Sequence, residues 1–163
     1  IQFKVQISQL SDFTTNGNDE VQFLFSANKN RVVQPVQLIA SGGEVSRLML
    51  SIKYLIANKS DLPTIIFDEI DTGVSGEIAH RMGEIMFNMS SGMQVITITH
   101  LPQIAAKGVQ HYKVFKQDNQ DITETNILRL GNEDRIMELA QMLSGKNITD
   151  AAVINAREML INN

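Results

Sequence analysis

The sequence has no cysteine and no tryptophan, and only 3 prolines among its 163 residues. Without cysteine the chain can form neither a disulfide scaffold nor a thiolate metal site, and it has no cysteine nucleophile. Long apolar runs are also missing. No stretch approaches the roughly 18 residues that a membrane-spanning helix needs, and residues 1–10 alternate instead of forming the apolar core of a signal peptide. These absences predict a cytoplasmic protein with no membrane contact.

Positive charge is scarce as well. The chain has 14 Lys and Arg against 18 Asp and Glu, for a formal net charge of −4. This balance argues against a surface that binds polyanions in general, and the cationic residues are scattered singly. With 43% hydrophobic residues, the chain is predicted to fold as a single globular domain over residues 1–163. It starts on Ile1 inside a strand-like pattern, which predicts a piece of a longer protein.

The N-terminal region has the period of two that is typical of strands. Apolar and polar residues alternate over 3–7 and again over 21–25, on either side of the polar, turn-rich residues 14–19. This pattern predicts an antiparallel hairpin. The next apolar segment, 32–39, contains Pro35, which has no backbone N–H to donate to a neighbouring strand. We therefore expect an edge strand or a loop there.

Beyond residue 41 the pattern changes to alternating helices and strands. Apolar residues recur at steps of three and four over 45–56 and 74–89, which predicts two amphipathic helices. Residues 64–67 and 95–99 are short β-branched and aromatic runs of the kind that is buried in a parallel sheet. A short helical segment is expected over 100–107. This order predicts an α/β fold with a parallel sheet and right-handed crossovers.

The C-terminal third is predicted to add a second hairpin and two helices. The hairpin strands are expected over 109–116 and 122–130, around Asp118 and Asn119. The helices are expected over about 133–143 and 149–161. The predicted architecture is therefore α/β, with a largely parallel sheet flanked by helices and with antiparallel hairpin additions.

A serine and two glycines precede the first predicted helix, in the segment ASGGEVSR (40–47). Ser41, Gly42 and Gly43 would leave free backbone N–H groups at the positive end of the helix dipole, which suits an anion such as phosphate. An N-cap serine with a flexible turn is the alternative explanation. The segment alone does not decide between the two.

Polar side chains also end both predicted buried strands. Asp68 and Glu69 follow the first strand, where open α/β sheets bind ligands, and two carboxylates there can divide the work of holding a hydrated Mg²⁺ and polarising a water. His100 directly follows the second strand and is expected at the same sheet edge, where it can donate a hydrogen bond to a phosphate oxygen or a water. Solvated turn acids and a structural histidine are the alternatives.

In order and spacing, these three features resemble the signature motif, the Walker B strand and the switch histidine of ABC-type ATPases. The segments IASGGEVSRLMLSIK, IIFDEIDTGVSG and ITITHLPQIAA resemble the C-terminal part of the RecN family, SMC-like proteins of bacterial double-strand-break repair. The resemblance covers residues 13–160. It implies the C-terminal lobe of a split ABC/SMC-type P-loop NTPase head, with ATPase activity in DNA repair and recombination.

The resemblance also implies a role for each motif residue. Asp68 would hold the Mg²⁺ that accompanies ATP, Glu69 would orient and polarise the attacking water, and His100 would contact the γ-phosphate. A second head in a nucleotide-dependent homodimer would supply the residues that close over the ATP from the other side. These cofactor-binding residues are Ser41, Gly42, Gly43 and Glu44. Ser75 stands where many relatives have an aspartate, so an aspartate-based role there is in doubt.

The P-loop is missing from the chain. No segment matches G-x-x-x-x-G-K-[ST], because the Gly145-Lys146 pair is followed by Asn147 and Ala140 stands in place of the first glycine. In the family that the chain resembles, the P-loop lies in an N-terminal lobe beyond a long coiled coil. The resemblance therefore implies that this N-terminal lobe is a partner and that the isolated chain is inactive. It also implies DNA ends as a partner of the whole protein, at the bacterial nucleoid.

Two other functions stay open at this stage. In isolation the chain is, in one interpretation, a non-catalytic dimerisation or assembly module. In another, it is a metal-dependent phosphohydrolase that uses a ligand set of Asp68, Glu69, Asp71 and His100. Binding of Mg-ATP by the chain alone, and hydrolysis of a phosphate ester without a partner lobe, would distinguish these functions.

Overall fold

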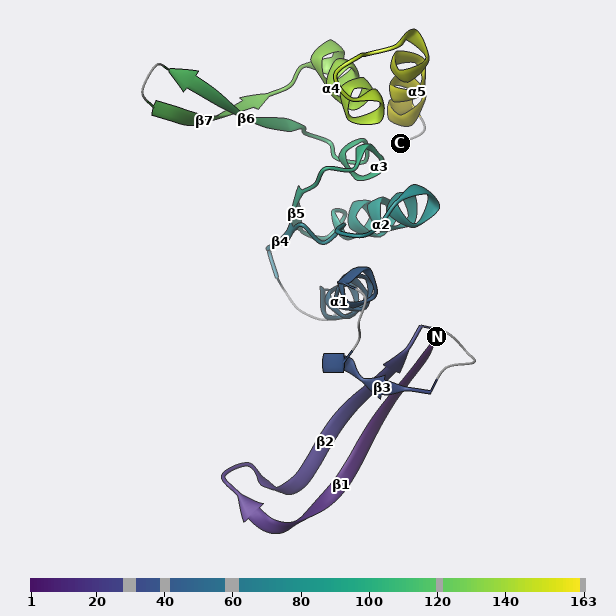
Figure 1. The fold of residues 1–163 in the computed structure, drawn as a ribbon, viewed down its shortest axis with the longest axis vertical. Helices are drawn as coiled ribbons and strands as arrows, with labels where there is room; N and C mark the ends of the chain where they lie inside the picture. Colours follow the sequence, from purple (N-terminus) through teal and green to yellow (C-terminus); the bar gives the residue numbers. More distant parts are fainter. Residues whose placement is uncertain (28–31, 39–41, 58–61, 120–121, 162–163) are drawn as a thin grey trace. The chain divides into compact units, whose positions relative to one another are not determined.

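The computed structural model describes residues 1–27, 32–38, 42–57, 62–119 and 122–161 (Figure 1). The chain divides into two compact units, Ile1–Ile52 and Lys53–Asn163, and the division falls inside the helix α1 (Gly42–Ala57). The expected single domain over residues 1–163 stays a prediction. Among the described helices, none combines the length and the apolar character needed to cross a membrane.

A long antiparallel ribbon forms most of the first unit (Figure 1). Strand β1 (Gln2–Thr14) pairs with β2 (Gly17–Ser26), which confirms the predicted hairpin and extends both strands into residues that were expected to form a turn. The short strand β3 (Gln34–Pro35) pairs with β2, and a 3₁₀ turn, η1 (Val36–Leu38), follows it. Pro35 therefore lies on an edge strand, as its missing N–H predicts.

One face of the β1–β2 ribbon is apolar and open to solvent. Val5 lies opposite Phe23 and Ile7 opposite Val21, and the Phe3 and Phe23 rings stack with their centroids 6.1 Å apart. These five side chains are between 48% and 66% exposed. Contiguous exposed apolar faces in proteins usually mark interaction surfaces.

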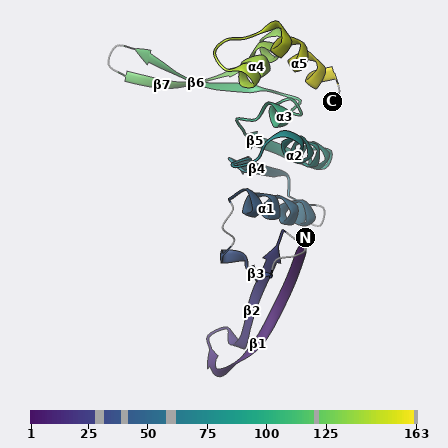
Figure 2. The same ribbon diagram turned by 45° about the vertical axis from the view of Figure 1, so that its right-hand side comes forward.

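The second unit contains the predicted parallel sheet. Strands β4 (Thr64–Asp68) and β5 (Gln94–Ile98) pair in parallel, and α2 (Gly76–Met89) connects them and packs on β5 (Figure 2). The α/β fold is thereby confirmed. Within the described ranges the parallel sheet has these two strands, and the other strand pairs are antiparallel.

The expectation that both strands are buried was wrong for one of their two faces. Phe67 is buried, but Ile66 is 57% exposed and Ile98 is 53% exposed. Successive side chains of a strand point to opposite faces, so a strand that is covered on one face leaves every second residue in solvent. The apolar composition of these runs resembles that of strands covered on both faces.

The buried stripe of α2 is rich in methionine, as expected for a core face. Its buried residues are Ala79, Met82, Gly83, Met86 and Met89. Gly83 permits the close approach of α3 (Pro102–Ala105): a Cβ atom there would lie 3.1 Å from the carbonyl oxygen of Gln103. The helix α3 is shorter than the segment predicted over 100–107.

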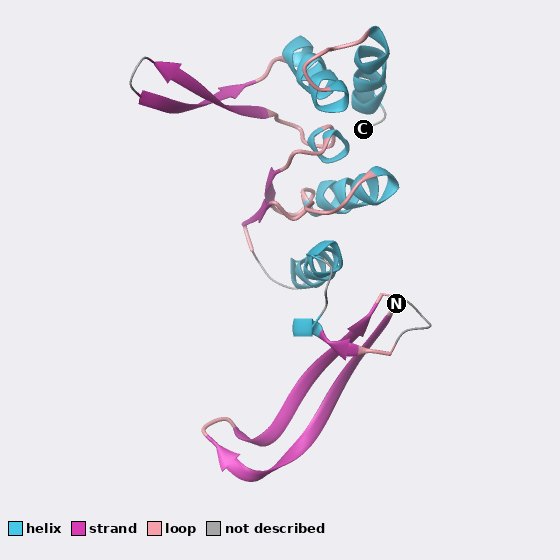
Figure 3. Cartoon of the chain, in the orientation of Figure 1, coloured by secondary structure: helices cyan, strands magenta, loops and turns pink. Residues whose placement is uncertain are grey.

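The C-terminal elements match the prediction in kind and order (Figure 3). Strands β6 (Tyr112–Asn119) and β7 (Ile122–Arg129) form the hairpin, so Asp118 and Asn119 belong to a strand and not to the turn. The helix α5 (Asp150–Ile161) packs on α4 (Asn132–Ser144), which also contacts α3. The buried cluster between these helices consists of Ala106, Leu139, Ala140, Ala152 and Ala156.

Candidate active site

Two exposed carboxylates lie at the carboxyl end of β4. Asp68 is the last residue of the strand and pairs with Ile98 of β5, and Glu69 follows it. Both side chains are exposed, and neither carboxylate has a hydrogen-bond or ion-pair partner among the described residues. Carboxylates in this state are free to accept hydrogen bonds from water or to ligate a hard cation.

The backbone at Glu69 has an unusual conformation. Its φ is 49°, and it is the single non-glycine residue with a positive φ among the described residues. The Glu69 carbonyl oxygen accepts a hydrogen bond from the Thr72 N–H at 3.3 Å and another from the Thr72 hydroxyl at 2.9 Å. Left-handed backbone at a non-glycine residue is costly and tends to occur at functional sites. A hydrogen-bonded turn therefore begins at the second carboxylate.

Asp71 lies on this turn and is fully buried, with a relative exposure of 0%. Its Oδ2 accepts hydrogen bonds from the Thr99 hydroxyl and from the His100 backbone N–H, the latter at 3.3 Å. Its Oδ1 is also buried and has no hydrogen-bond partner in the described part of the chain. Asp71 thus joins the loop after β4 to the residues that follow β5.

His100 lies two residues beyond the end of β5, at the sheet edge where Asp68 and Glu69 lie. Its imidazole is 68% exposed, and the Nδ1 atom lies 3.5 Å from Asp71 Oδ2. The register of the two parallel strands therefore brings the predicted acids and the predicted histidine to one edge. His80 and His111, for which no chemical role was expected, lie elsewhere, on α2 and just before β6.

The glycine-rich segment is described in part. Ser41 lies outside the described residues. Gly42 is the exposed first residue of α1, Gly43 is buried and Glu44 is half-buried. A helix of 16 residues that begins at a glycine offers free N–H groups and a positive dipole end to an anion. Ser75 precedes α2 in an extended conformation, and its side chain does not cap that helix.

The described residues contain no group of three or more His, Cys, Asp and Glu side chains arranged to hold a metal ion. A metal-dependent phosphohydrolase that works alone would need such a set. A magnesium ion bound together with a nucleotide needs less, because Mg²⁺ usually keeps several waters and binds one or two carboxylates plus phosphate oxygens. The exposed Asp68 carboxylate fits this second arrangement.

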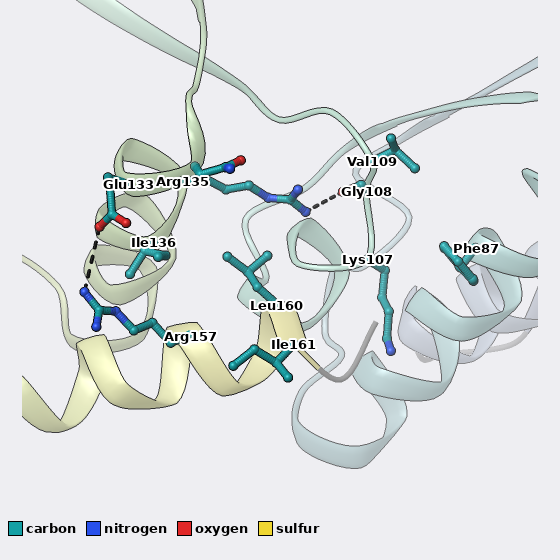
Figure 4. A pocket seen from close by; sticks show the side chains of 11 residues that line it. Phe87, Lys107, Gly108, Val109, Glu133, Arg135, Ile136, Arg157, Leu160 and Ile161 are labelled. Atoms are coloured by element: carbon teal, nitrogen blue, oxygen red, sulfur yellow. Dashed lines mark hydrogen bonds and ion pairs between the residues drawn. The ribbon is translucent and has the colours of Figure 1, made fainter.

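A separate pocket of about 610 Å³ lies between the C-terminal helices (Figure 4). Arg135 lies at its edge and donates hydrogen bonds to the carbonyl oxygens that follow α3, including that of Ala106 at 2.7 Å. Glu133 forms an ion pair with Arg157 at 3.8 Å. Burial lowers the pKa of Arg135, which nevertheless stays protonated at neutral pH. The Arg135 contacts hold the end of α3 in place.

Sequence reasoning missed what Asp71 and Thr99 do. Asp71 was considered only as a possible metal ligand, and the burial of this carboxylate was not expected. The flanking residues Ile70 and Val74 are both buried, and their apolar character is the one sequence signal that the turn folds inward. Thr99 has no such signal, because threonine is common in strands of every kind.

Comparison with known proteins gives a consistent family. No family model matches the chain. It is 43% identical to the DNA repair protein RecN of Vibrio cholerae over 98% of its residues, 43% identical to that of Rickettsia prowazekii over 97%, and 40% identical to that of Haemophilus influenzae over 98%. The chain spans 28–29% of the length of these curated relatives.

Solved structures agree on the fold. A structure described for the ATP-driven dimerization and DNA-stimulated activation of SMC ATPases matches 88% of this chain and 84% of the solved chain, with a TM-score of 0.56 and 17% identity. An Smc head domain from Pyrococcus yayanosii matches 79% of this chain and 23% of the solved chain, with a TM-score of 0.61 and 19% identity. The fold is that of an SMC head, and by its similarity to the curated relatives along nearly its whole length the chain belongs to the RecN family.

Proposed function

We propose that this chain is the C-terminal lobe of an ATP-hydrolysing head in a DNA repair protein. The observation that carries the proposal is the parallel pairing of β4 and β5, which brings Asp68, Glu69 and His100 to one sheet edge. The similarity to RecN proteins along nearly the whole chain supports the repair role of the complete protein. We propose the bacterial cytoplasm as its location, in keeping with the similarity to DNA repair proteins of bacteria.

Asp68 is the residue that we assign to magnesium. Its carboxylate is exposed at the end of β4 and has no side-chain partner in the described ranges. A bound Mg²⁺ would neutralise charge on the phosphate oxygens during phosphoryl transfer. Asp68 would hold it by supplying one oxygen ligand, directly or through a water.

Glu69 and His100 are assigned to the reacting atoms. The Glu69 carboxylate accepts a hydrogen bond from the attacking water and orients its oxygen toward the γ-phosphorus. His100 donates a hydrogen bond to a γ-phosphate oxygen, where negative charge must be stabilised. The left-handed backbone of Glu69 and the exposure of both side chains support these roles.

The remaining contacts to ATP come from two other sources. We assign the binding of the ATP phosphates to the P-loop of an N-terminal lobe, because no segment of the 163-residue sequence matches the P-loop motif. Ser41, Gly42, Gly43 and Glu44 act in trans, at the N-terminus of α1, on ATP held by a second head. DNA ends are a partner of the complete protein. Without the N-terminal lobe, the isolated chain is an inactive dimerisation or assembly module.

Replacing Glu69 with glutamine in the full-length protein tests this function. Glu69→Gln keeps the shape of the side chain but removes the charge that orients the water, so turnover should fall about 100-fold or more while ATP-bound dimers accumulate. Steady-state phosphate release and size-exclusion chromatography with ATP measure the two effects. Glu77→Gln is the matched control, because Glu77 is exposed on α2 and pairs with Arg81. Undiminished turnover in Glu69→Gln would refute the role of Glu69.

A further inference from the structure

Asp71 is a buried charge that the proposed hydrolysis does not use. Its side chain is 1% exposed, and one of its two oxygens has no hydrogen-bond partner among the described residues. Removing a carboxylate from water is unfavourable unless hydrogen bonds replace the lost hydration, and an unsatisfied oxygen adds to the cost. A neutral polar residue at this position of the turn would have a smaller desolvation cost. The burial of this particular group therefore points to a task at the site.

The satisfied oxygen of Asp71 organises the turn that follows β5. Its Oδ2 accepts hydrogen bonds from the Thr99 hydroxyl and the His100 N–H. The Thr99 oxygen in turn accepts a hydrogen bond from the Leu101 N–H at 3.0 Å. Asp71 Oδ2 thereby holds Thr99 and His100 directly and Leu101 through the Thr99 hydroxyl, and the backbone of these residues determines where the His100 side chain starts.

The same oxygen also faces the imidazole ring. His100 Nδ1 lies 3.5 Å from Asp71 Oδ2, whereas the ring as a whole is 68% exposed. A carboxylate beside Nδ1 favours a proton on that nitrogen and fixes the ring orientation, a relation that recurs wherever a second residue orients a functional histidine. When the ring carries a proton on both nitrogens, Nδ1 faces Asp71 and Nε2 is the nitrogen left to donate to a phosphate oxygen.

We propose that Asp71 is the positioning residue of His100, and that it fixes this ring relative to the Glu69 carboxylate. Asp71 lies on the turn in which the Glu69 carbonyl oxygen accepts the Thr72 N–H, and the Asp71 carbonyl oxygen accepts the Val74 N–H at 3.1 Å. The loop that carries the water-orienting carboxylate is thereby tied to the residue that faces the phosphate. This inference rests on the proposed role of His100 in hydrolysis.

A double-mutant cycle in the full-length protein tests the inference. Asp71→Asn should lower kcat about 10-fold or more and leave the KM for ATP within about 3-fold, because a positioning residue acts on the reacting geometry and not on nucleotide binding. His100→Ala should lower kcat further. If Asp71 acts through His100, the double variant should turn over ATP at the same rate as His100→Ala alone.

Each outcome of the cycle decides something. Additive losses would overturn the positioning role, as would an Asp71→Asn variant with normal kcat beside an impaired His100→Ala. If His100→Ala itself has normal turnover, the proposed function fails at His100 and the inference fails with it.

Two threonine variants cover the case in which Asp71→Asn does not fold. Thr99→Val removes the hydroxyl donor and should lower kcat in the same non-additive way, whereas Thr99→Ser keeps the donor and should restore it. ¹⁵N chemical shifts of the His100 ring in the ATP-bound protein should report a proton on each ring nitrogen in the wild type and a less protonated Nδ1 in Asp71→Asn. Unchanged ¹⁵N shifts would contradict the contact.

Discussion

The carboxyl edge of β4 and β5 and the cluster of α3, α4 and α5 belong to the same unit but differ in what their residues do. The edge has exposed carboxylates, a left-handed backbone at Glu69 and a buried charge at Asp71. The cluster is built from a leucine and small alanines that are nearly or fully buried, with Leu139 and Ala140 at 0% exposure. Strain and unsatisfied polar groups are unfavourable for folding, whereas apolar burial is favourable. The comparison indicates that the cluster stabilises this unit, whereas the edge has unfavourable features that the proposed hydrolysis would explain.

Truncation of Leu139 should have the largest effect on stability. Leu139→Ala leaves a cavity in the centre of the cluster, and we expect a loss of about 2 to 5 kcal/mol in the free energy of unfolding. Urea unfolding of the 163-residue chain followed by circular dichroism measures it. Met137→Ala on the same helix is the control, because Met137 is 45% exposed. A full-length Leu139→Ala protein that stays folded should keep its ATP turnover, and a selective loss of turnover would break the comparison.

Loss of the Arg135 guanidinium should have a smaller effect. It donates to the carbonyl oxygens of Ala105, Ala106 and Gly108 at the end of α3. Arg135→Met keeps much of the side-chain bulk but removes the guanidinium donor from these hydrogen bonds, so the free energy of unfolding should fall by about 1 to 3 kcal/mol. Arg129→Met, at an exposed position on β7, is the control and should change stability little. Equal losses of unfolding free energy in the two variants would show that the hydrogen bonds from Arg135 to the end of α3 do not contribute to stability.

The smallest expected effect is a pH dependence at His111, just before β6. Burial is the strongest influence that lowers the pKa of His111 below the usual 6.5; the charges of Arg135 and Lys113 lower it too, and Glu138 raises it. The unfolded chain therefore binds this proton more readily than the folded chain. Stability should be unaffected above about pH 6.5 and should fall as the pH drops below it.

Thermal unfolding between pH 7.5 and pH 5.5 measures this effect, with His111→Gln as the test variant. Its Tm should fall less than that of the wild type on acidification. Tyr112→Phe, a change on the adjacent residue that adds and removes no charge in this range, should follow the wild type. If His111→Gln loses as much stability as the wild type, another group is responsible for the pH dependence.

Much of the fold could be predicted because the local patterns agree with the packing. The two hairpins, the β4–α2–β5 order and the C-terminal helices follow from periods of two and of three to four residues. The exposed side of β4 could not be predicted. Ile66 has the composition of a residue in a fully covered strand, and composition does not reveal what covers it. The exposure of the apolar face of the β1–β2 ribbon could not be predicted for the same reason.

The candidate site could be predicted for those residues that lie next to the end of a strand in the sequence. Asp68 ends β4, Glu69 follows it, and His100 lies two residues beyond the end of β5, so parallel pairing is enough to bring them to one edge. The inward turn that buries Asp71 depends on the left-handed conformation of Glu69 and on hydrogen bonds to residues 28 and 29 positions away. Such long-range hydrogen bonds leave no periodic signal in the sequence.

The central claim is that the edge of one head and the glycine-rich segment of another complete a single ATPase site. Mixing two full-length variants, Ser41→Arg and Glu69→Gln, each of which should have little turnover alone, tests it most directly. A mixed dimer has one site with both defects and one with neither, so random pairing should restore about a quarter of the wild-type phosphate release. Phosphate release that stays at the level of the separate variants would contradict the account.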